Sequence, residues 1–453
     1  MSALTRSRAT LVYLVLVLIL GGASAAGLMA NVLLQVLGAG LIGWSLWGAS
    51  PGAQHTGLRR FAVVLAILAA VQFLPLPPVL WSHLPGRGAI AAGFELMQVP
   101  LPWLNLSLSP WHSLASLTWW LPALALFVAL RAPDAPNGRQ LVTVIAWVGA
   151  ISVVLGGLQR AGGLGYIYEI TNVGEGPGFF ANSNHQGSFL LCAVALLGGQ
   201  LAGEAASSRR FDWRAGENTL RVGLLALLLL GVLVSGSLAC VALLIPVVIA
   251  LALIFLPSVH LPMPLVLGAM IVMVAGFAVF LLFGPVANDL THTSTTAGIS
   301  RQEFLITGSR ILRDFAPFGS GLGTFQELYP RYENVAQIGS TFVNHAHDDL
   351  LEILIETGIF GLAAVFVFLA WFLPRATALW RGDRVRTVAL AASVVIAVEL
   401  IHSLVDYPLR TAAMSSIMAI AFTLLVRAQE SVRQHRGQAH RPSQAVDRSL
   451  IRI

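Results

Sequence analysis

The chain has 453 residues, of which 56% are hydrophobic and only 11% are charged. Soluble domains carry about a quarter charged residues, so this composition excludes an ordinary soluble fold and indicates a polytopic membrane protein. All 27 basic residues are arginine, and the net charge of +6 does not by itself point to nucleic acid, because the positions of the arginines matter more than their sum.

Apolar runs predict an all-α fold with about twelve transmembrane helices, since a backbone in lipid must satisfy its own hydrogen bonds. The predicted spans cover residues 9–25, 28–48, 60–77, 113–131, 140–160, 185–202, 219–234, 238–256, 264–284, 349–374, 387–406 and 411–427. They divide the chain into spans one to nine over residues 1–284, one long loop over 285–348, spans ten to twelve over 349–428, and a disordered tail over 429–453.

The distribution of arginine predicts the orientation in the membrane. With the N-terminus inside, 20 arginines fall on the inner side and 7 on the outer side. The positive-inside rule then places both termini in the cytoplasm and the long loop on the outer side of the membrane. The seven outer arginines are Arg87, Arg160, Arg301, Arg310, Arg313, Arg331 and Arg410.

Three outer segments follow in chain order. Residues 78–112 combine proline with tryptophan, which suits a loop in the headgroup interface. Residues 161–184 are rich in glycine and lead directly to His185, for which an interfacial helix cap is the alternative to a functional role. The longest loop, 285–348, is expected to contain a short amphipathic helix from Arg301 to Leu312, broken afterwards by glycines.

The arginines of this loop are candidates for anion binding. Arg301, Arg310 and Arg313 are separated by nine and three residues, and we expect all three near one face of the helix. Clustered guanidinium groups suit a pyrophosphate, whose oxygens accept paired hydrogen bonds. The alternative is a set of ordinary surface arginines.

Two histidines close the loop, at His345 and His347. A general base near neutral pH is most simply a histidine, and a carboxylate such as Asp348 could orient the ring. Helix capping by Asn344 or Asp348 is a compatible structural role. A zinc site is the further alternative, but the loop offers no obvious third or fourth ligand, so we predict no metal.

Near the end of the eleventh span, Glu399, His402 and Asp406 follow offsets of three and four that place them on one helical face. Ionisable residues within a span are functional candidates, although a structural network between helices is equally compatible with the pattern. Because spans ten and eleven are neighbours in sequence, this cluster and the histidines of the loop can face one outward cavity.

Several of these segments resemble the O-antigen ligase and polysaccharide polymerase superfamily of bacterial inner membranes. The similar segments are Phe180 to His185, the loop that opens at Arg301 and closes with Pro317 to Phe325, His345 to Leu350 running into Glu356 to Leu362, and His402 to Pro408. The resemblance covers about residues 160–410, whereas the first 150 residues match only in hydropathy.

The resemblance implies a glycosyltransferase that moves an undecaprenyl-pyrophosphate-linked glycan to an acceptor sugar hydroxyl on the periplasmic side. The loop arginine of the family matches Arg301, and its catalytic histidine best matches His347. Two departures stand out: Leu238 occupies a position where many relatives carry an arginine, and Asp348 replaces a common asparagine. One phosphate contact of the family is then either missing or supplied elsewhere, by Arg310, Arg313 or Arg160.

The sequence therefore predicts a metal-independent, inverting transfer without a cofactor, in which His347 is the base and Arg301 neutralises the departing pyrophosphate. The predicted substrate-binding residues are Arg310, Arg313, Arg160, His185, Asn184, His345, Asp348, His402 and Asp406. The expected partners are the lipid-linked donor, an acceptor glycan that is either lipid A core or a growing polysaccharide, and membrane lipids, with no nucleic acid. The rival hypothesis is a transporter or flippase of lipid-linked oligosaccharide, but transporters concentrate their ionisable residues near the bilayer midplane.

Overall fold

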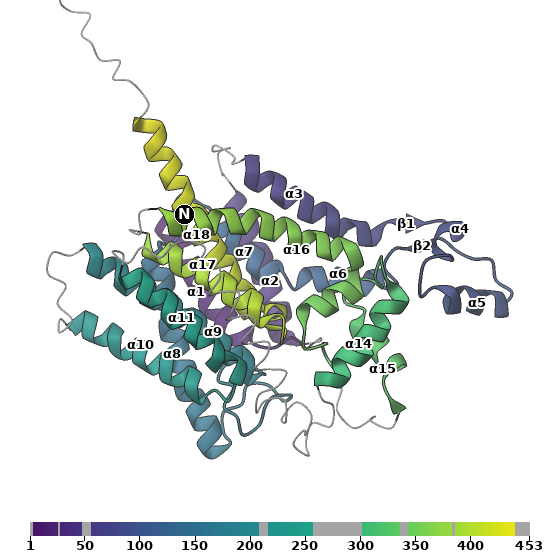
Figure 1. Cartoon of the computed structure of the whole chain (residues 1–453), viewed down its shortest axis with the longest axis horizontal. Coiled ribbons are helices and arrows are strands. Elements are labelled where there is room, and N and C mark those ends of the chain that lie inside the picture. Colours follow the sequence, from purple (N-terminus) through teal and green to yellow (C-terminus); the bar gives the residue numbers. More distant parts are fainter. Residues whose placement is uncertain are drawn as a thin grey trace, which may run out of the picture.

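A computed structural model describes residues 3–25, 28–47, 56–207, 216–256, 301–335, 343–382 and 386–439. These residues form a bundle of helices with one pair of two-residue strands (Figure 1). The N-terminal half contributes α1 (Ala3–Leu20), α2 (Met29–Leu46), α3 (Thr56–Ala70), α6 (Pro110–Thr118), α7 (Leu121–Leu130), α8 (Gly138–Gly162) and α9 (Ser183–Ser207). The remainder contributes α10 (Gly216–Val234), α11 (Leu238–Phe255), α14 (Arg301–Phe315), α15 (Phe325–Tyr332), α16 (Asp349–Arg381), α17 (Thr387–His402) and α18 (Ala412–Ala439).

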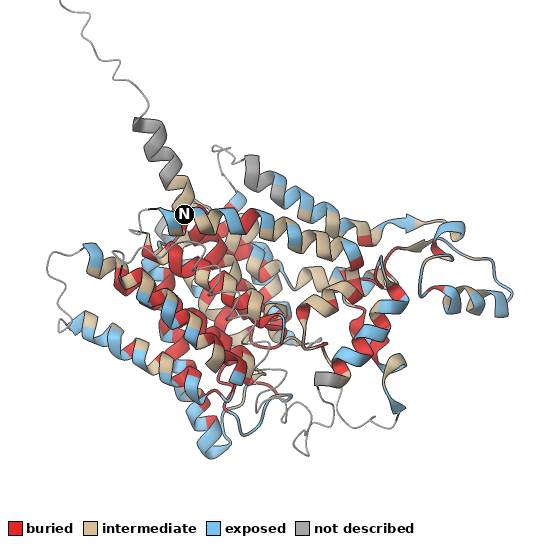
Figure 2. Cartoon of the chain, in the orientation of Figure 1, coloured by how far each residue is buried: buried red, intermediate tan, exposed pale blue. Residues whose placement is uncertain are grey.

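The helix α9 lies at the centre of the bundle, with every residue from Ser183 to Ala202 buried except Asn184. It packs against α8, α10, α11 and α17 (Figure 2). Small residues permit this close packing: a Cβ on Gly199 would lie 2.9 Å from the backbone oxygen of Thr387 on α17. Helices in lipid associate through such small residues, because lipid gives no hydrophobic force between them.

Eight helices within the described ranges are long and apolar enough to cross a membrane. They include α8, α9, α10, α11 and α16, and two shorter apolar helices cover Ala62–Phe73 and Thr387–His402. The chain is therefore a multi-pass helical protein, while the count of about twelve stays a prediction. The ninth predicted span, residues 264–284, lies outside the described residues, and so does most of the tail.

The long helix α16 bends at Gly358, where φ is +57°. The bend frees the carbonyls of two residues from their helical partners, and a turn from the preceding loop satisfies them. Ser320 donates its backbone N–H to the Ile355 oxygen at 3.0 Å, and Gly321 donates to the Glu356 oxygen at 2.7 Å. Buried backbone groups need such partners, so the glycine-rich turn is built to fit the bend.

The amphipathic loop helix is confirmed as α14, three residues longer than expected. Its buried residues Phe304, Ile311 and Phe315 form a small core with Phe325 and Tyr329 of α15. The helix also packs against α16, where a Cβ on Gly308 would approach Leu351 to 2.8 Å. This second core fixes the loop helix beside the first turn of α16.

The expectation that three arginines share one face of α14 is wrong. At about 3.6 residues per turn, nine positions make about two and a half turns, so positions 301 and 310 lie on opposite sides of the helix. Arg310 and Arg313 are exposed, away from the buried face that carries Phe304. The side chain of Arg301 lies outside the described residues.

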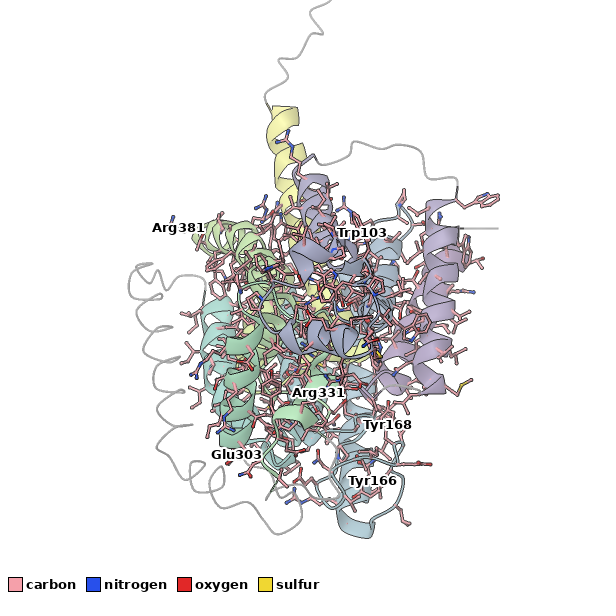
Figure 3. The ribbon with its side chains drawn as sticks, turned by 90° about the vertical axis from the view of Figure 1, so that its right-hand side faces the viewer. Trp103, Tyr166, Tyr168, Glu303, Arg331 and Arg381 are labelled. Carbon is pink, nitrogen blue, oxygen red and sulfur yellow. The ribbon has the colours of Figure 1, made fainter. Side chains whose placement is uncertain are left out.

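The segment before α6 extends from the bundle as a small lobe (Figure 1). It contains η1 (Val71–Phe73), β1 (Pro75–Leu76), α4 (Pro78–Trp81), α5 (Gly88–Leu96) and β2 (Leu104–Asn105), with β1 and β2 antiparallel. Trp81 is buried and donates to the Pro102 oxygen, whereas Trp103 is exposed (Figure 3). The predicted placement of residues 78–112 in the headgroup interface of the membrane stays a prediction.

Candidate functional site

His347 has a backbone conformation that one other described non-glycine residue shares, the exposed Gln98 of the lobe before α6. The φ of His347 is +53°, in the left-handed region that residues other than glycine rarely adopt. Strain of this kind costs about 1–3 kcal/mol and persists only where the surrounding structure imposes it. Such positions cluster at functional sites, so the conformation itself points to His347.

Three neighbours surround the imidazole of His347. Its Nδ1 lies 3.5 Å from Oδ1 of Asp406, and its ring stacks on Phe304 of α14 at 5.0 Å between centroids with an interplanar angle of 22°. Tyr407 contacts it edge-on at 4.8 Å. Nδ1 is buried while the side chain keeps 28% exposure, so a substrate that reaches a ring nitrogen of His347 has to meet Nε2.

Asp406 connects three distant parts of the chain. Its Oδ2 accepts a hydrogen bond of 2.7 Å from Asn184 at the start of α9, and its Oδ1 lies 3.5 Å from Nε2 of His185 as well as from His347. Burial alone would raise the pKa of Asp406, but the two imidazoles outweigh it and hold that pKa well below its usual range. The aspartate is therefore a fixed negative charge behind His347. We call His347, Asp406 and Phe304 the rim cluster.

His345 turns inward, although it lies only two residues from His347. Its Nδ1 donates to Oε1 of Glu352 at 2.9 Å, and the other oxygen of Glu352 accepts from the backbone of Ala346 at 2.8 Å. Burial lowers the pKa of His345 and outweighs the attraction of Glu352. The side chain is buried, so its structural role differs from the substrate contact that we predicted from sequence.

A half-buried arginine completes this inner group. Arg410, from η3 (Pro408–Arg410), lies 2.8 Å from Asp349, 2.8 Å from Glu352 and 3.5 Å from Glu356. The three carboxylates are spaced at i, i+3 and i+7 along the first two turns of α16, which places them on one face. We call His345, Asp349, Glu352, Glu356 and Arg410 the interior cluster.

The interior cluster is also tied to the backbone. Ser403 donates its hydroxyl to Asp349 at 2.9 Å and accepts from the Asp349 backbone at 2.8 Å, joining the end of α17 to the start of α16. Phe325 donates its backbone N–H to Glu356 at 3.3 Å. Buried ions persist in a fold when their charges and lone pairs are met in this way.

Asp348 caps α16, as predicted. It is the N-cap residue, and its side chain accepts from the Leu351 backbone at 3.0 Å. Asn344, the other predicted cap, instead pairs with Gln326 at 2.5 Å and with Ser24 at 3.0 Å. The cap fixes the point at which the chain leaves His347 and enters the helix.

Tyr407 lies between the two clusters and touches three imidazoles. Its ring centroid is 4.9 Å from His185, 4.4 Å from His345 and 4.8 Å from His347. Burial raises the pKa of Tyr407, so the phenol stays protonated near neutral pH. Among the three histidines and Tyr407 of this site, His347 is therefore the residue best placed to accept a proton from a substrate.

The predicted face of Glu399, His402 and Asp406 divides between two environments. Glu399 accepts from Ser188 at 2.7 Å and from Cys192 at 3.1 Å, which links α17 to α9 inside the bundle. His402 is fully buried. Asp406 lies 3.5 Å from His347 of the loop, whereas Glu399 bonds into the interior of the bundle, so the described contacts place these two members of the trio in different environments.

Arg160 lies at the end of α8 and donates to the Val234 oxygen at 3.1 Å. That carbonyl ends α10, just before the turn that leads to Leu238. Cys240, in the first turn of α11, donates to the Asn184 oxygen at 3.4 Å, and Asn184 bonds Asp406. The turn between α10 and α11 and the first turn of α11 therefore link Arg160 indirectly to the rim cluster.

Among the described residues, no group of three or more histidine, cysteine, aspartate and glutamate side chains is arranged to hold a metal ion. The site residues that the sequence reasoning missed are Phe304, Glu352, Glu356, Tyr407 and Arg410. The spacing of Asp349, Glu352 and Glu356 inside an apolar run was an available signal for a buried acidic face. No local pattern could have paired that face with Arg410, which follows more than fifty residues later in the chain.

A comparison with protein families adds an independent finding. Residues 223–366 match the family described as O-Antigen ligase, and no curated protein matches the chain. The matched segment contains α14, His347 and the bend of α16, whereas Asp406 and His185 lie outside it. The match supports the resemblance drawn from the sequence motifs: residues 223–366 correspond to an O-antigen ligase domain.

Proposed function

Since the chain carries an O-antigen ligase domain, we propose that it is an integral-membrane glycosyltransferase of surface polysaccharide biosynthesis. It transfers an undecaprenyl-pyrophosphate-linked oligo- or polysaccharide to an acceptor sugar hydroxyl. The observation that carries the proposal is His347: a strained and partly exposed histidine, set between Asp406 and Phe304 within the matched domain.

His347 is the general base of the proposed reaction. Its Nε2 takes the proton of the acceptor hydroxyl while that oxygen attacks the anomeric carbon of the donor. The bond from this carbon to the pyrophosphate oxygen breaks, and the electron pair leaves with undecaprenyl pyrophosphate. Attack opposite the leaving group inverts the anomeric centre. Pyrophosphate is a good leaving group, so base catalysis with charge stabilisation is chemically sufficient and needs no metal or cofactor.

Asp406 supports this role of His347 electrostatically. The buried carboxylate faces Nδ1, so it favours the tautomer that carries hydrogen on Nδ1 and a lone pair on Nε2. The same negative charge stabilises the imidazolium that forms when the proton arrives. A buried carboxylate behind a histidine base has this dual role in hydrolases of unrelated fold.

Arg301 is the proposed partner for the departing pyrophosphate, because guanidinium binds phosphate oxygens in pairs and stabilises charge as it develops. Position 301 begins α14 and precedes Phe304 by three residues, about one turn along the same side of the helix. Phe304 contacts His347, so this helix brings its first turn towards the base. Arg160 is the proposed second phosphate contact, in place of the family arginine that Leu238 replaces.

We further propose that the reaction takes place on the periplasmic side of a bacterial inner membrane, with both termini cytoplasmic. The arginine distribution supports this orientation. In Figure 3, Arg381 at the end of α16 lies towards the top, whereas Glu303 in the first turn of α14 lies towards the bottom. This view therefore separates the arginine-bearing end of α16 from the first turn of α14.

The acceptor is either lipid A core, which would make the protein a ligase, or the growing polysaccharide, which would make it a polymerase. The product that accumulates in a deletion strain distinguishes the two. Chains limited to one repeat unit indicate a polymerase, whereas full-length polymer retained on undecaprenol indicates a ligase.

The direct test uses purified His347→Ala and Arg301→Ala with a lipid-linked donor. We expect each to lose at least about 100-fold in transfer rate, the usual contribution of a positioned base or of a charge contact in the transition state. His83→Ala and Arg331→Ala remove the same residue types elsewhere and serve as matched controls. The proposal fails if both test variants fold normally and transfer at rates near that of the wild type.

A further inference from the structure

The stacking contact between Phe304 and His347 joins two segments that are far apart in the chain. Phe304 is 9% exposed and lies on the buried face of α14, while His347 precedes α16. The rings are nearly parallel, at 22°, with centroids 5.0 Å apart. Offset aromatic pairs at such distances contribute about 0.5–1.5 kcal/mol beyond the burial of their surface. The contact is therefore strong enough to influence the orientation of one side chain.

His347 needs such support. Its left-handed backbone is costly, and Nδ1 stands 3.5 Å from Asp406, at the outer limit for a hydrogen bond. The carboxylate alone therefore fixes the ring weakly. Tyr407 meets the imidazole edge-on, at 71°, and restricts one side. The Phe304 ring covers a face of the imidazole and determines its plane.

We propose that Phe304 is a positioning residue for the transfer reaction, an inference that rests on the proposed function. Its ring holds the imidazole of His347 so that Nδ1 points to Asp406 and Nε2 points to the acceptor hydroxyl. Because Phe304 lies one turn from Arg301 on α14, the same helix sets both the base and the phosphate-binding arginine. A base misplaced by about 1 Å loses on the order of 100-fold in rate, so a contact of this kind affects turnover strongly.

A purely structural role for Phe304 is the competing explanation, because the residue also packs against Tyr329 at 5.9 Å in the small core of the loop. Phe325 offers a matched comparison. It belongs to the same core, is fully buried and contacts Tyr329 at 5.4 Å, and no contact joins its ring to His347 among those described. A structural role predicts similar consequences for the two phenylalanines, whereas a positioning role separates them.

The experiment compares Phe304→Leu, Phe304→Tyr and Phe325→Leu in the purified full-length protein. Leucine fills the core but cannot stack, so we expect Phe304→Leu to lower kcat at least about tenfold while KM for the lipid-linked donor changes less than about twofold. Phe304→Tyr keeps the stack and should stay within about threefold of the wild-type kcat. Phe325→Leu should lower the melting temperature at least as much as Phe304→Leu but leave kcat within about threefold.

A double-mutant comparison gives a second readout. In the His347→Ala background, Phe304→Leu should reduce the residual rate by less than about twofold, because the ring that it positions is gone. The inference is overturned if Phe304→Leu keeps the wild-type kcat, if Phe304→Tyr falls as far as Phe304→Leu, or if Phe325→Leu lowers kcat equally. Normal transfer by His347→Ala would instead contradict the proposed function itself, so the two failures are distinguishable.

Discussion

The rim cluster and the interior cluster each contain one histidine of the same short segment, His347 and His345, yet these two side chains lie in opposite environments. His347 of the rim cluster has a strained backbone, an exposed edge and a carboxylate at 3.5 Å. His345 of the interior cluster is buried and bonded to Glu352 at 2.9 Å, which in turn lies 2.8 Å from Arg410. The difference teaches that a dense group of ionisable residues does not by itself locate chemistry. Charges that are mostly buried and paired with opposite charges stabilise the fold, whereas a more weakly paired and partly exposed group such as His347 is available to react.

The interior cluster should give the largest effect on folding. Arg410→Met leaves Asp349, Glu352 and Glu356 without their shared cation, and breaking a buried charge network typically costs about 3–5 kcal/mol. We expect a strongly lowered melting temperature and poor accumulation in the membrane. The measurement is thermal unfolding in detergent, with Arg331→Met as the control. A variant that unfolds like the wild type but is inactive would assign the chemistry to the interior cluster instead.

The rim cluster should give the opposite result. Asp406→Asn removes the charge behind His347 but keeps an amide that can bond Asn184, so we expect at least about a 100-fold loss of transfer rate with a small change in melting temperature. Steady-state transfer assays together with thermal unfolding measure both quantities. Loss of stability equal to that of Arg410→Met would erase the distinction between the two clusters.

The pH dependence of stability sharpens the comparison further. The folded-state pKa of His345 is lowered, so below about pH 6.5 this site binds more protons in the unfolded chain, and the contribution of His345 to stability falls with decreasing pH. Asp406 also has a lowered pKa, and its contribution is present above about pH 4 and is lost only as the pH falls through the folded-state value. Between pH 7.5 and 5, the melting temperature should therefore decline less in His345→Gln than in the wild type. An unchanged slope in that variant would mean that His345 is not the titrating group.

The smallest effects are expected on the exposed side of α14. Arg310 and Arg313 lie away from the face that carries Phe304, so Arg310→Ala and Arg313→Ala should each change the transfer rate less than about threefold. Donor titrations at low and high ionic strength provide the measurement, with Arg301→Ala as the reference. If either variant lost as much activity as Arg301→Ala, the donor would bind on the exposed side of α14 that carries Arg310 and Arg313.

The fold was largely predictable, because runs of apolar residues have few alternatives to helices in lipid. Most predicted spans within the described residues fall mainly on one helix, although span 113–131 is divided between α6 and α7 and span 60–77 ends in η1 and β1. Asp348 caps α16, as its local pattern indicated. The prediction that Arg301, Arg310 and Arg313 share one face of α14 was wrong. It relied on their closeness in sequence, whereas helical periodicity places positions 301 and 310 on opposite sides of the helix.

The candidate site was predictable only in its local part. His347 and Asp406 could be named because ionisable residues are rare in such a chain. Their pairing, and the roles of Phe304 and Tyr407, depend on tertiary contacts between α14, the start of α16 and the segment after α17. Only the resemblance to the family separated His347 from His345, because residue type and spacing treat the two alike; in the structure they differ in backbone angle and in burial.

Chemical rescue of His347→Ala by added imidazole tests the role of this residue most directly. If His347 supplies only an accessible basic nitrogen, a free imidazole that enters the vacated space should restore part of the transfer rate, in proportion to its unprotonated fraction. The account predicts an inactive, folded variant whose rate rises with imidazole concentration, while Asp406→Asn gains little. Full transfer activity of His347→Ala without imidazole would contradict it.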